Sequence, residues 1–188
     1  MMIQGYINLF AIVIAATVIL QLPIFFILKK KGKGLIRQSS YLLCFWSFFI
    51  IVFATIILFN LPFRFDPGQS VLNLSPFQWL REGNIMRRIM TEIRPNILLF
   101  IPLGLFIPIV FKRMRKLHMT ALIVFTVTLS VEFFQYFIGR SSDIDDLIAN
   151  LSGGIIGYGI FRILMLMFKN KQWWNKLADE KGKVSKSK

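Results

Sequence analysis

Ionisable side chains are scarce in this sequence. Only 17% of its 188 residues are charged, with a single histidine and a single cysteine. Soluble domains usually carry roughly 25% charged residues, so the composition argues against a water-soluble domain. Cys44 has no partner for a disulfide within the chain. His118 lies in a loop that the charge pattern assigns to the cytoplasm, which excludes histidine-based acid–base catalysis at the outer face.

Common enzyme motifs are missing as well. The chain has no glycine-rich nucleotide-binding fingerprint, no Cys/His spacing typical of zinc sites and no Gly-x-Ser-x-Gly. It is instead 55% hydrophobic, and its apolar runs approach the ~20 residues that a spanning helix needs. The runs are residues 6–28, 41–59, 96–111, 119–138 and 146–168. Pro102 and Pro108 predict a kink in the third run. The sequence therefore predicts an all-α polytopic transmembrane helix bundle with about five spans.

The basic residues are clustered. Sixteen of the 23 lie in residues 29–37, in residues 112–116 or in the tail from Lys169. The net charge of +14 is compatible with nucleic-acid binding, but each cluster flanks an apolar run, as cytoplasmic loops of membrane proteins do. We therefore expect no nucleic-acid partner, an outside N-terminus and a cytoplasmic C-terminus. The remaining loops hold equal numbers of basic and acidic residues, six of each, which agrees with an outer location.

Four regions follow along the chain. Residues 1–60 form two N-terminal spans, 61–95 an extracellular loop, 96–168 a three-helix core, and 169–188 a basic cytoplasmic tail. Within residues 84–94 the apolar side chains recur on one helical face, which predicts a short amphipathic helix. It either lies in the membrane interface or caps the bundle. Trp173 and Trp174 are expected in an interfacial aromatic belt, with a disordered tail after them.

Glu132 is the most informative residue, because it lies inside the fourth predicted span. A carboxylate at the centre of a spanning helix costs roughly 2.5–3.5 kcal/mol, and such residues face the bundle interior and mark function. Gln135 is three residues on and shares the same helix face. A helix that starts near residue 142 or 143 places Asp143, Asp146 and Asn150 on one stripe.

These polar residues are expected at one depth, just beneath the outer surface. Arg94 and Asn96 enter from the outer end of the third span. The candidate functional residues are Asn96, Glu132, Gln135, Arg140, Asp143, Asp146 and Asn150. Structural alternatives stay open: Ser142 with Asp145 has the spacing of a capping box, and Arg140 is a ready ion-pair partner for Glu132 or Asp146.

At these residues the sequence resembles the VanZ-like family. The resemblance covers roughly residues 73–163. It rests on Asn-Leu-Ser-Pro-Phe at 73–77, Asn-Ile-Leu-Leu-Phe-Ile-Pro-Leu-Gly at 96–104, Glu-Phe-Phe-Gln at 132–135, Arg-Ser-Ser-Asp-Ile-Asp-Asp at 140–146, then Asn150 and Gly153-Gly154. The family is named after a protein associated with teicoplanin resistance. The resemblance implies a multi-pass protein of the bacterial cell membrane, but no particular reaction.

Three functions remain open. The first is binding of a lipid headgroup, a lipid-linked wall precursor or a lipoglycopeptide antibiotic, with Arg140, Arg94 and Asn96 in contact with the ligand. The second is an enzyme that acts on a lipid-linked substrate, in which Glu132, Asp143 and Asp146 hold Mg²⁺, Mn²⁺ or Ca²⁺, ions that prefer oxygen ligands. The third is a transporter, although no inverted repeat is visible. The sequence does not set the oligomeric state.

Overall fold

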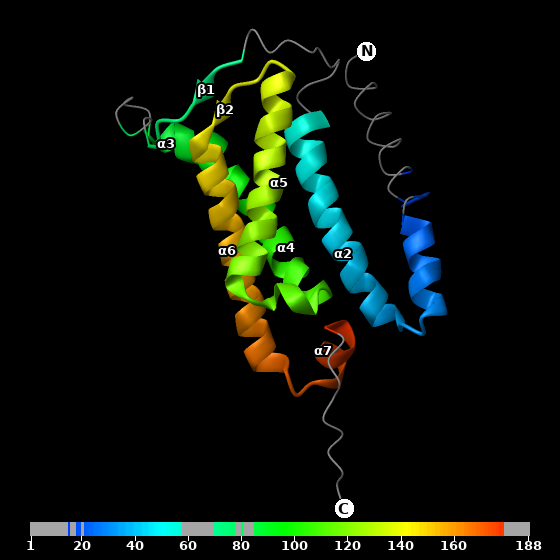
Figure 1. The fold of residues 1–188 in the computed structure, drawn as a ribbon. Helices are drawn as coiled ribbons and strands as arrows, with labels where there is room; N and C mark the ends of the chain where they lie inside the picture. The colour runs from blue at the N-terminus through cyan, green and yellow to red at the C-terminus, as the bar shows by residue number, and fades with distance from the viewer. Residues whose placement is uncertain are drawn as a thin grey trace, which may run out of the picture.

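The protein is a bundle of long helices (Figure 1). The computed structural model describes residues 15, 18–19, 21–57, 70–77, 80 and 85–178. The helices after helical residues 21–30 are α2 (Leu35–Val52), α3 (Ile85–Arg88), α4 (Arg94–Val110), α5 (Leu117–Phe137), α6 (Ile144–Phe168) and α7 (Gln172–Leu177). Two-residue strands β1 (Leu72–Asn73) and β2 (Ser142–Asp143) pair in parallel. Residues Lys112–Arg115 form a 3₁₀ turn.

Four helices among the described residues are long and apolar enough to cross a membrane. They are Leu35–Ile56, Ile85–Val110, Leu117–Phe137 and Ile144–Phe168. The predicted all-α bundle of spanning helices is confirmed, with the second to fifth predicted runs in these helices. Most of the first predicted span, residues 6–28, lies outside the described residues.

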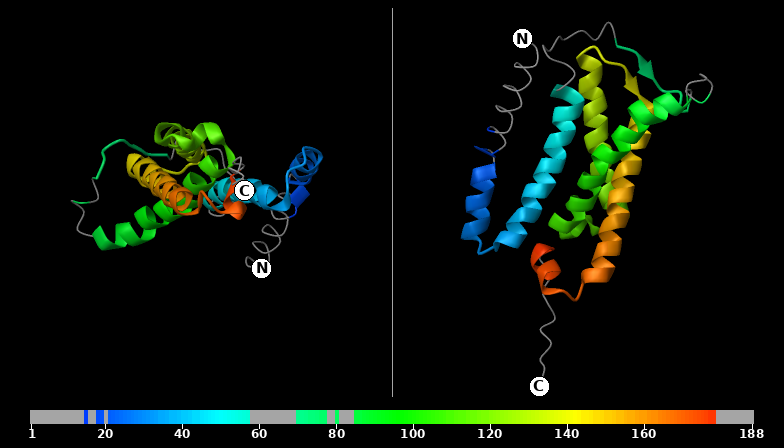
Figure 2. Two further views of the ribbon diagram at one scale, coloured as in Figure 1. Left: turned by 90° about the horizontal axis from the view of Figure 1, so that it is seen from below. Right: turned by 180° about the vertical axis from the view of Figure 1, so that it is seen from behind.

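The third span is longer than the apolar run that predicted it. The helix expected over residues 84–94 is present from Ile85, and it continues without a break into α4 as one helix of 26 residues. The two parts join through a π-helical stretch, Ile89–Ile93. Pro95, the second residue of α4, has no N–H to donate, and the wider π-helical turn before it accommodates the missing hydrogen bond. The amphipathic segment is thus the N-terminal end of a span, tilted away from the bundle in Figure 2.

Glycines bring α4 and α6 into close contact, and the two helices lie side by side (Figures 1 and 2). A Cβ at Gly153 would overlap the carbonyl oxygen of Ile97, and one at Gly157 would overlap that of Ile101. Gly104 meets the backbone of Gly154 in the same way. Small residues permit such close approach of helices in a membrane. The contact brings the N-terminal ends of α4 and α6 together.

The C-terminal part of the described chain differs from the prediction. Trp174 was expected in an interfacial belt, with disorder after it, but α7 runs to Leu177 and Trp174 is 1% exposed. Its ring stacks on Phe161 of α6, with ring centroids 6.4 Å apart, in a cluster that includes Ile109. The indole is therefore part of the core, because α7 folds back against the bundle instead of continuing along the membrane surface.

Two arginines hold α7 in this position. Arg37 of α2 donates hydrogen bonds to the carbonyl oxygens of Ile109 (3.0 Å) and Leu177 (2.8 Å). Arg115 donates to the carbonyl oxygen of Ala178 (2.8 Å). The last carbonyls of a helix have no partner within the helix and carry its negative dipole end. The guanidinium groups of Arg37 and Arg115 therefore donate hydrogen bonds to free carbonyl oxygens at the C-terminal ends of both α4 and α7.

The close approach of α4 and α6 predicts different effects for two alanine substitutions in α6. Gly157→Ala should lower the free energy of unfolding by about 1–3 kcal/mol, because the new methyl group has no room. Gly159→Ala is the control, since its Cβ would meet nothing within 4 Å and alanine favours a helix by up to about 1 kcal/mol. Thermal unfolding in detergent measures both. Equal stability of the two variants would contradict the packing described.

Candidate functional site

A cavity of about 390 Å³ lies at the end of the bundle that carries β2. Its walls come from the π-helical stretch Phe53–Ile57 after α2, the helix Ile85–Val110, the last turns of α5 and the start of α6. Six of the seven candidate residues predicted from the sequence line it: Asn96, Glu132, Gln135, Arg140, Asp146 and Asn150. These polar side chains are spread over more than fifty positions in the chain. The fold brings them together around one cavity.

Glu132 connects α5 to the start of α6. Its side chain is 5% exposed, and Oε2 accepts hydrogen bonds from the Ser142 hydroxyl (2.9 Å) and the Asp143 backbone N–H (3.2 Å). A buried carboxylate requires such donors, because burial removes its hydration. Glu132 therefore has a structural role at the turn between the helices as well as a place in the cavity wall.

Asp143 begins α6 but does not line the cavity. Its Oδ1 accepts a hydrogen bond from the N–H of Asp145 (2.9 Å), so Asp143 is the N-cap of α6. The predicted capping box with Ser142 at the cap is therefore wrong: the Ser142 hydroxyl donates to Glu132 instead. Asp143 Oδ2 accepts from Asn73 of β1 (3.2 Å) and from Arg88.

Arg88 is the residue that sequence reasoning missed. Its Nη2 lies 2.6 Å from Asp143 Oδ2, and its Nε lies 2.9 Å from Glu92 Oε2. The spacing of apolar residues in 84–94 placed Arg88 on the polar face of the amphipathic helix and indicated no partner for it beyond that helix. The Arg88–Glu92 spacing of four residues was the available signal, but it predicts only a pair on one helix surface. The contact with Asp143 depends on how the helix lies against β2.

The two neighbouring carboxylates of α6 have different partners. Asp145 is 4% exposed, and its Oδ1 accepts a hydrogen bond from the N–H of Phe77 (2.9 Å). Phe77 has φ +59°, a conformation that residues other than glycine rarely adopt, so this bond helps to hold the backbone at Phe77 in place. Asp146 lines the cavity, and its Oδ1 accepts from Asn96 Nδ2 of α4 (2.8 Å).

Gln135 and Arg140 converge on the stretch that follows α2. Both donate to the carbonyl oxygen of Thr55, at 3.1 Å and 3.2 Å. Thr55 lies in the π-helical stretch Phe53–Ile57, where carbonyl groups are displaced from α-helical hydrogen bonding. The ion pairs near the cavity in the described part of the chain are those of Arg88. The alternative in which Arg140 pairs with Glu132 or Asp146 is therefore not what the structure has.

Arg94, predicted to contact the ligand, does not line the cavity. Arg94 is exposed, and its Nη1 lies 3.6 Å from Met90 Sδ, outside the cavity lining. The reason is the unbroken helix, in which Arg94 and Asn96 point about 200° apart.

Within the described ranges, no group of three His, Cys, Asp or Glu side chains is placed to hold a metal ion. The divalent ion at Glu132, Asp143 and Asp146 stays a prediction.

Asn150 forms part of the buried cavity wall at 2% exposure. Its Nδ2 donates to Thr128 Oγ1 of α5 (2.8 Å). Its Oδ1 is buried and accepts no hydrogen bond from the described residues. An unpaired buried carbonyl of this kind costs about 1–3 kcal/mol.

Comparison with known proteins identifies the family. A family model described as VanZ/LLP1 matches residues 41–167, which include every cavity-lining residue. The chain belongs to the VanZ/LLP1 family. It is 30% identical to Protein VanZ of Enterococcus faecium over 120 residues, a match that covers 61% of this chain and 70% of that protein. No solved structure matches. The predicted resemblance is confirmed, and this VanZ/LLP1 chain is a membrane protein.

The Arg88–Asp143 contact of this VanZ/LLP1 protein is testable by a double-mutant cycle. Arg88→Gln and Asp143→Asn should each lower the free energy of unfolding by about 1–3 kcal/mol, because each removes a charge-assisted hydrogen bond between largely buried groups. The double variant should lose less than the sum of the two. Arg87→Gln, at the exposed neighbouring position, is the control and should change stability little. Additive losses would contradict a direct contact.

Proposed function

We propose that the cavity binds the polar head of a membrane-embedded molecule and thereby contributes to teicoplanin-type resistance. The ligand is a lipid headgroup, a lipid-linked cell-wall precursor or a lipid-bearing glycopeptide antibiotic. The observation that carries this proposal is the cavity of about 390 Å³ lined by nine polar side chains, inside a helix bundle that is apolar on its surface. Its volume lies within the roughly 300–1,000 Å³ typical of ligand sites.

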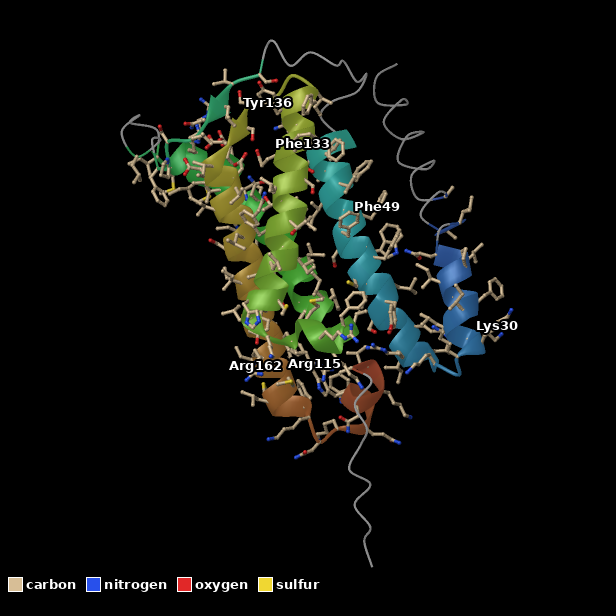
Figure 3. The ribbon with its side chains drawn as sticks, in the orientation of Figure 1. Lys30, Phe49, Arg115, Phe133, Tyr136 and Arg162 are labelled. Carbon is tan, nitrogen blue, oxygen red and sulfur yellow. The ribbon has the colours of Figure 1, made fainter. Side chains whose placement is uncertain are left out.

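The surface beside the cavity supports an amphiphilic ligand. On α5, Glu132 and Gln135 are buried, whereas Phe133 and Phe134 between them are 59% and 54% exposed. Figure 3 shows Phe133 and Tyr136 in the outer half of α5, the half that contributes to the cavity. A head in the cavity therefore leaves its hydrocarbon tail next to aromatic side chains that face lipid. This arrangement suits a ligand that enters from the side, within the membrane.

The charge distribution supports an outward-facing cavity. Figure 3 shows Lys30, Arg115 and Arg162 toward the end of the bundle where α7 lies, and Tyr136 toward the opposite end. The basic residues at positions 29–33, 112–116 and 169–176 lie in helix ends, turns and the short helix α7 at this end of the bundle. Positively charged loops stay in the cytoplasm. We infer that β1, β2 and the cavity face the outside.

Cysteine labelling tests this orientation. With Cys44 replaced by alanine, Ser141→Cys should react with a membrane-impermeant maleimide on intact cells, because Ser141 is exposed beside the cavity. Lys169→Cys, which is equally exposed at the other end of α6, should react only after the cells are opened. Labelling of Lys169→Cys but not Ser141→Cys on intact cells would reverse the orientation.

The proposed function predicts which substitutions remove resistance. Expression of the chain in a susceptible bacterium should raise the inhibitory concentration of teicoplanin. Glu132→Gln and Arg140→Gln should abolish at least about three quarters of that increase, because each changes a charged group that lines the cavity. Arg94→Gln is the matched control, since Arg94 lies outside the cavity, and should keep the increase.

Membrane abundance must be measured for all three variants in the same cells. Loss of resistance in step with loss of protein would show that Glu132 and Arg140 act only on stability. Full resistance in both cavity variants, at normal abundance, would contradict the proposal.

A further inference from the structure

The cavity contains acceptor oxygens that the protein does not use. Glu132 accepts its hydrogen bonds through Oε2, and Asp146 accepts its one through Oδ1. Within the described chain, Glu132 Oε1 and Asp146 Oδ2 accept none, and Asn150 Oδ1 is buried without a donor. Three side chains from two facing helices therefore each present an unpaired acceptor at the cavity wall.

The amide donors of the cavity are already engaged. Asn96 Nδ2 donates to Asp146, Gln135 Nε2 donates to Thr55, and Asn150 Nδ2 donates to Thr128. None of these amide groups donates to the unpaired oxygens of Glu132, Asp146 and Asn150. A ligand that completes this site must bring N–H or O–H groups.

The charged groups that line the cavity are mostly negative. Three carboxylates line it, those of Glu92, Glu132 and Asp146, against one guanidinium, that of Arg140. Glu92 is paired with Arg88. Glu132 and Asp146 have no ion-pair partner in the described residues, so the site favours a cation with hydrogen-bond donors.

We propose that the cavity takes a primary ammonium group, with Glu132, Asp146 and Asn150 as its three acceptors. This inference rests on the proposed function and names the chemical class of the headgroup. An alkylammonium has three N–H donors, one for each of the oxygens Glu132 Oε1, Asp146 Oδ2 and Asn150 Oδ1. The Arg140 guanidinium has five N–H groups and gives one nitrogen to Thr55, so it is available for a phosphate attached to the same head. An ethanolamine phospholipid has both groups.

The test is a set of lipid titrations on the full chain in detergent, followed by native mass spectrometry. Phosphatidylethanolamine should bind at least about tenfold more tightly than phosphatidylglycerol, because a charge-assisted hydrogen bond accounts for that much affinity. N-acetyl-phosphatidylethanolamine keeps the phosphate but loses the cation, and phosphatidylcholine keeps the cation but has no N–H. Both should bind as weakly as phosphatidylglycerol. Lysyl-phosphatidylglycerol also has ammonium groups but holds them farther from its phosphate. It therefore tests whether the distance between the two groups matters.

Variants connect the preference to the cavity. Glu132→Gln and Asp146→Asn should each reduce the preference for phosphatidylethanolamine about tenfold or more, while phosphatidylglycerol binding stays within twofold. Asp145→Asn is the control, since it removes the same charge at the adjacent position outside the cavity, and should keep the preference. Arg140→Gln should weaken both lipids together. Melting temperatures of all variants identify any that are misfolded.

The outcomes separate this inference from the proposed function. Equal binding of phosphatidylethanolamine and phosphatidylglycerol, both weakened by Arg140→Gln, would overturn the ammonium site and leave headgroup binding intact. A preference for phosphatidylethanolamine that persists in Glu132→Gln and Asp146→Asn would also overturn it. Binding of none of these phospholipids would overturn the ammonium site, and it would leave only the wall precursor and the antibiotic as ligands under the proposed function.

Discussion

The buried carboxylate of Glu132 is the contact on which the cavity end of the molecule depends. Its Oε2 accepts from the Ser142 hydroxyl and the Asp143 N–H, and so fixes how the chain turns between α5 and α6. With that turn in place, Asp143 meets Arg88 and Asn73. An apolar residue at position 132 would leave these donors buried without a partner, which costs about 1–3 kcal/mol for each group.

A second constraint is the close contact of α4 with α6. Because Gly153 and Gly157 leave no side chain between the helices, the backbone of α6 reaches the carbonyls of Ile97 and Ile101. The same approach brings Asn96 within 2.8 Å of Asp146. Packing in the middle of the bundle thereby sets the shape of the cavity at its end. Polar groups of the cavity wall are held mainly by side chains and carbonyls of other helices, which makes it a rigid site.

The candidate site was largely predictable, because polar residues are so costly in a membrane that each one in an apolar run is informative. Six predicted residues line one cavity. Arg88 was missed because it belongs to a segment whose polar face looked solvated, and Arg94 was included because nearness in sequence to Asn96 was taken for nearness in space. Trp174 was assigned to the membrane interface because nothing local indicates that α7 folds back onto Phe161.

The sequence by itself determined that the chain is a bundle of membrane-spanning helices of the VanZ/LLP1 family, and which polar residues lie within it. Those properties follow from local composition and period, since each helix satisfies its own backbone hydrogen bonds in lipid. Only the tertiary structure decided which polar atoms are paired and which are not. The unpaired acceptors of Glu132, Asp146 and Asn150 depend on the rotation and spacing of α4, α5 and α6, because hydrogen bonds form or fail over a few tenths of an ångström.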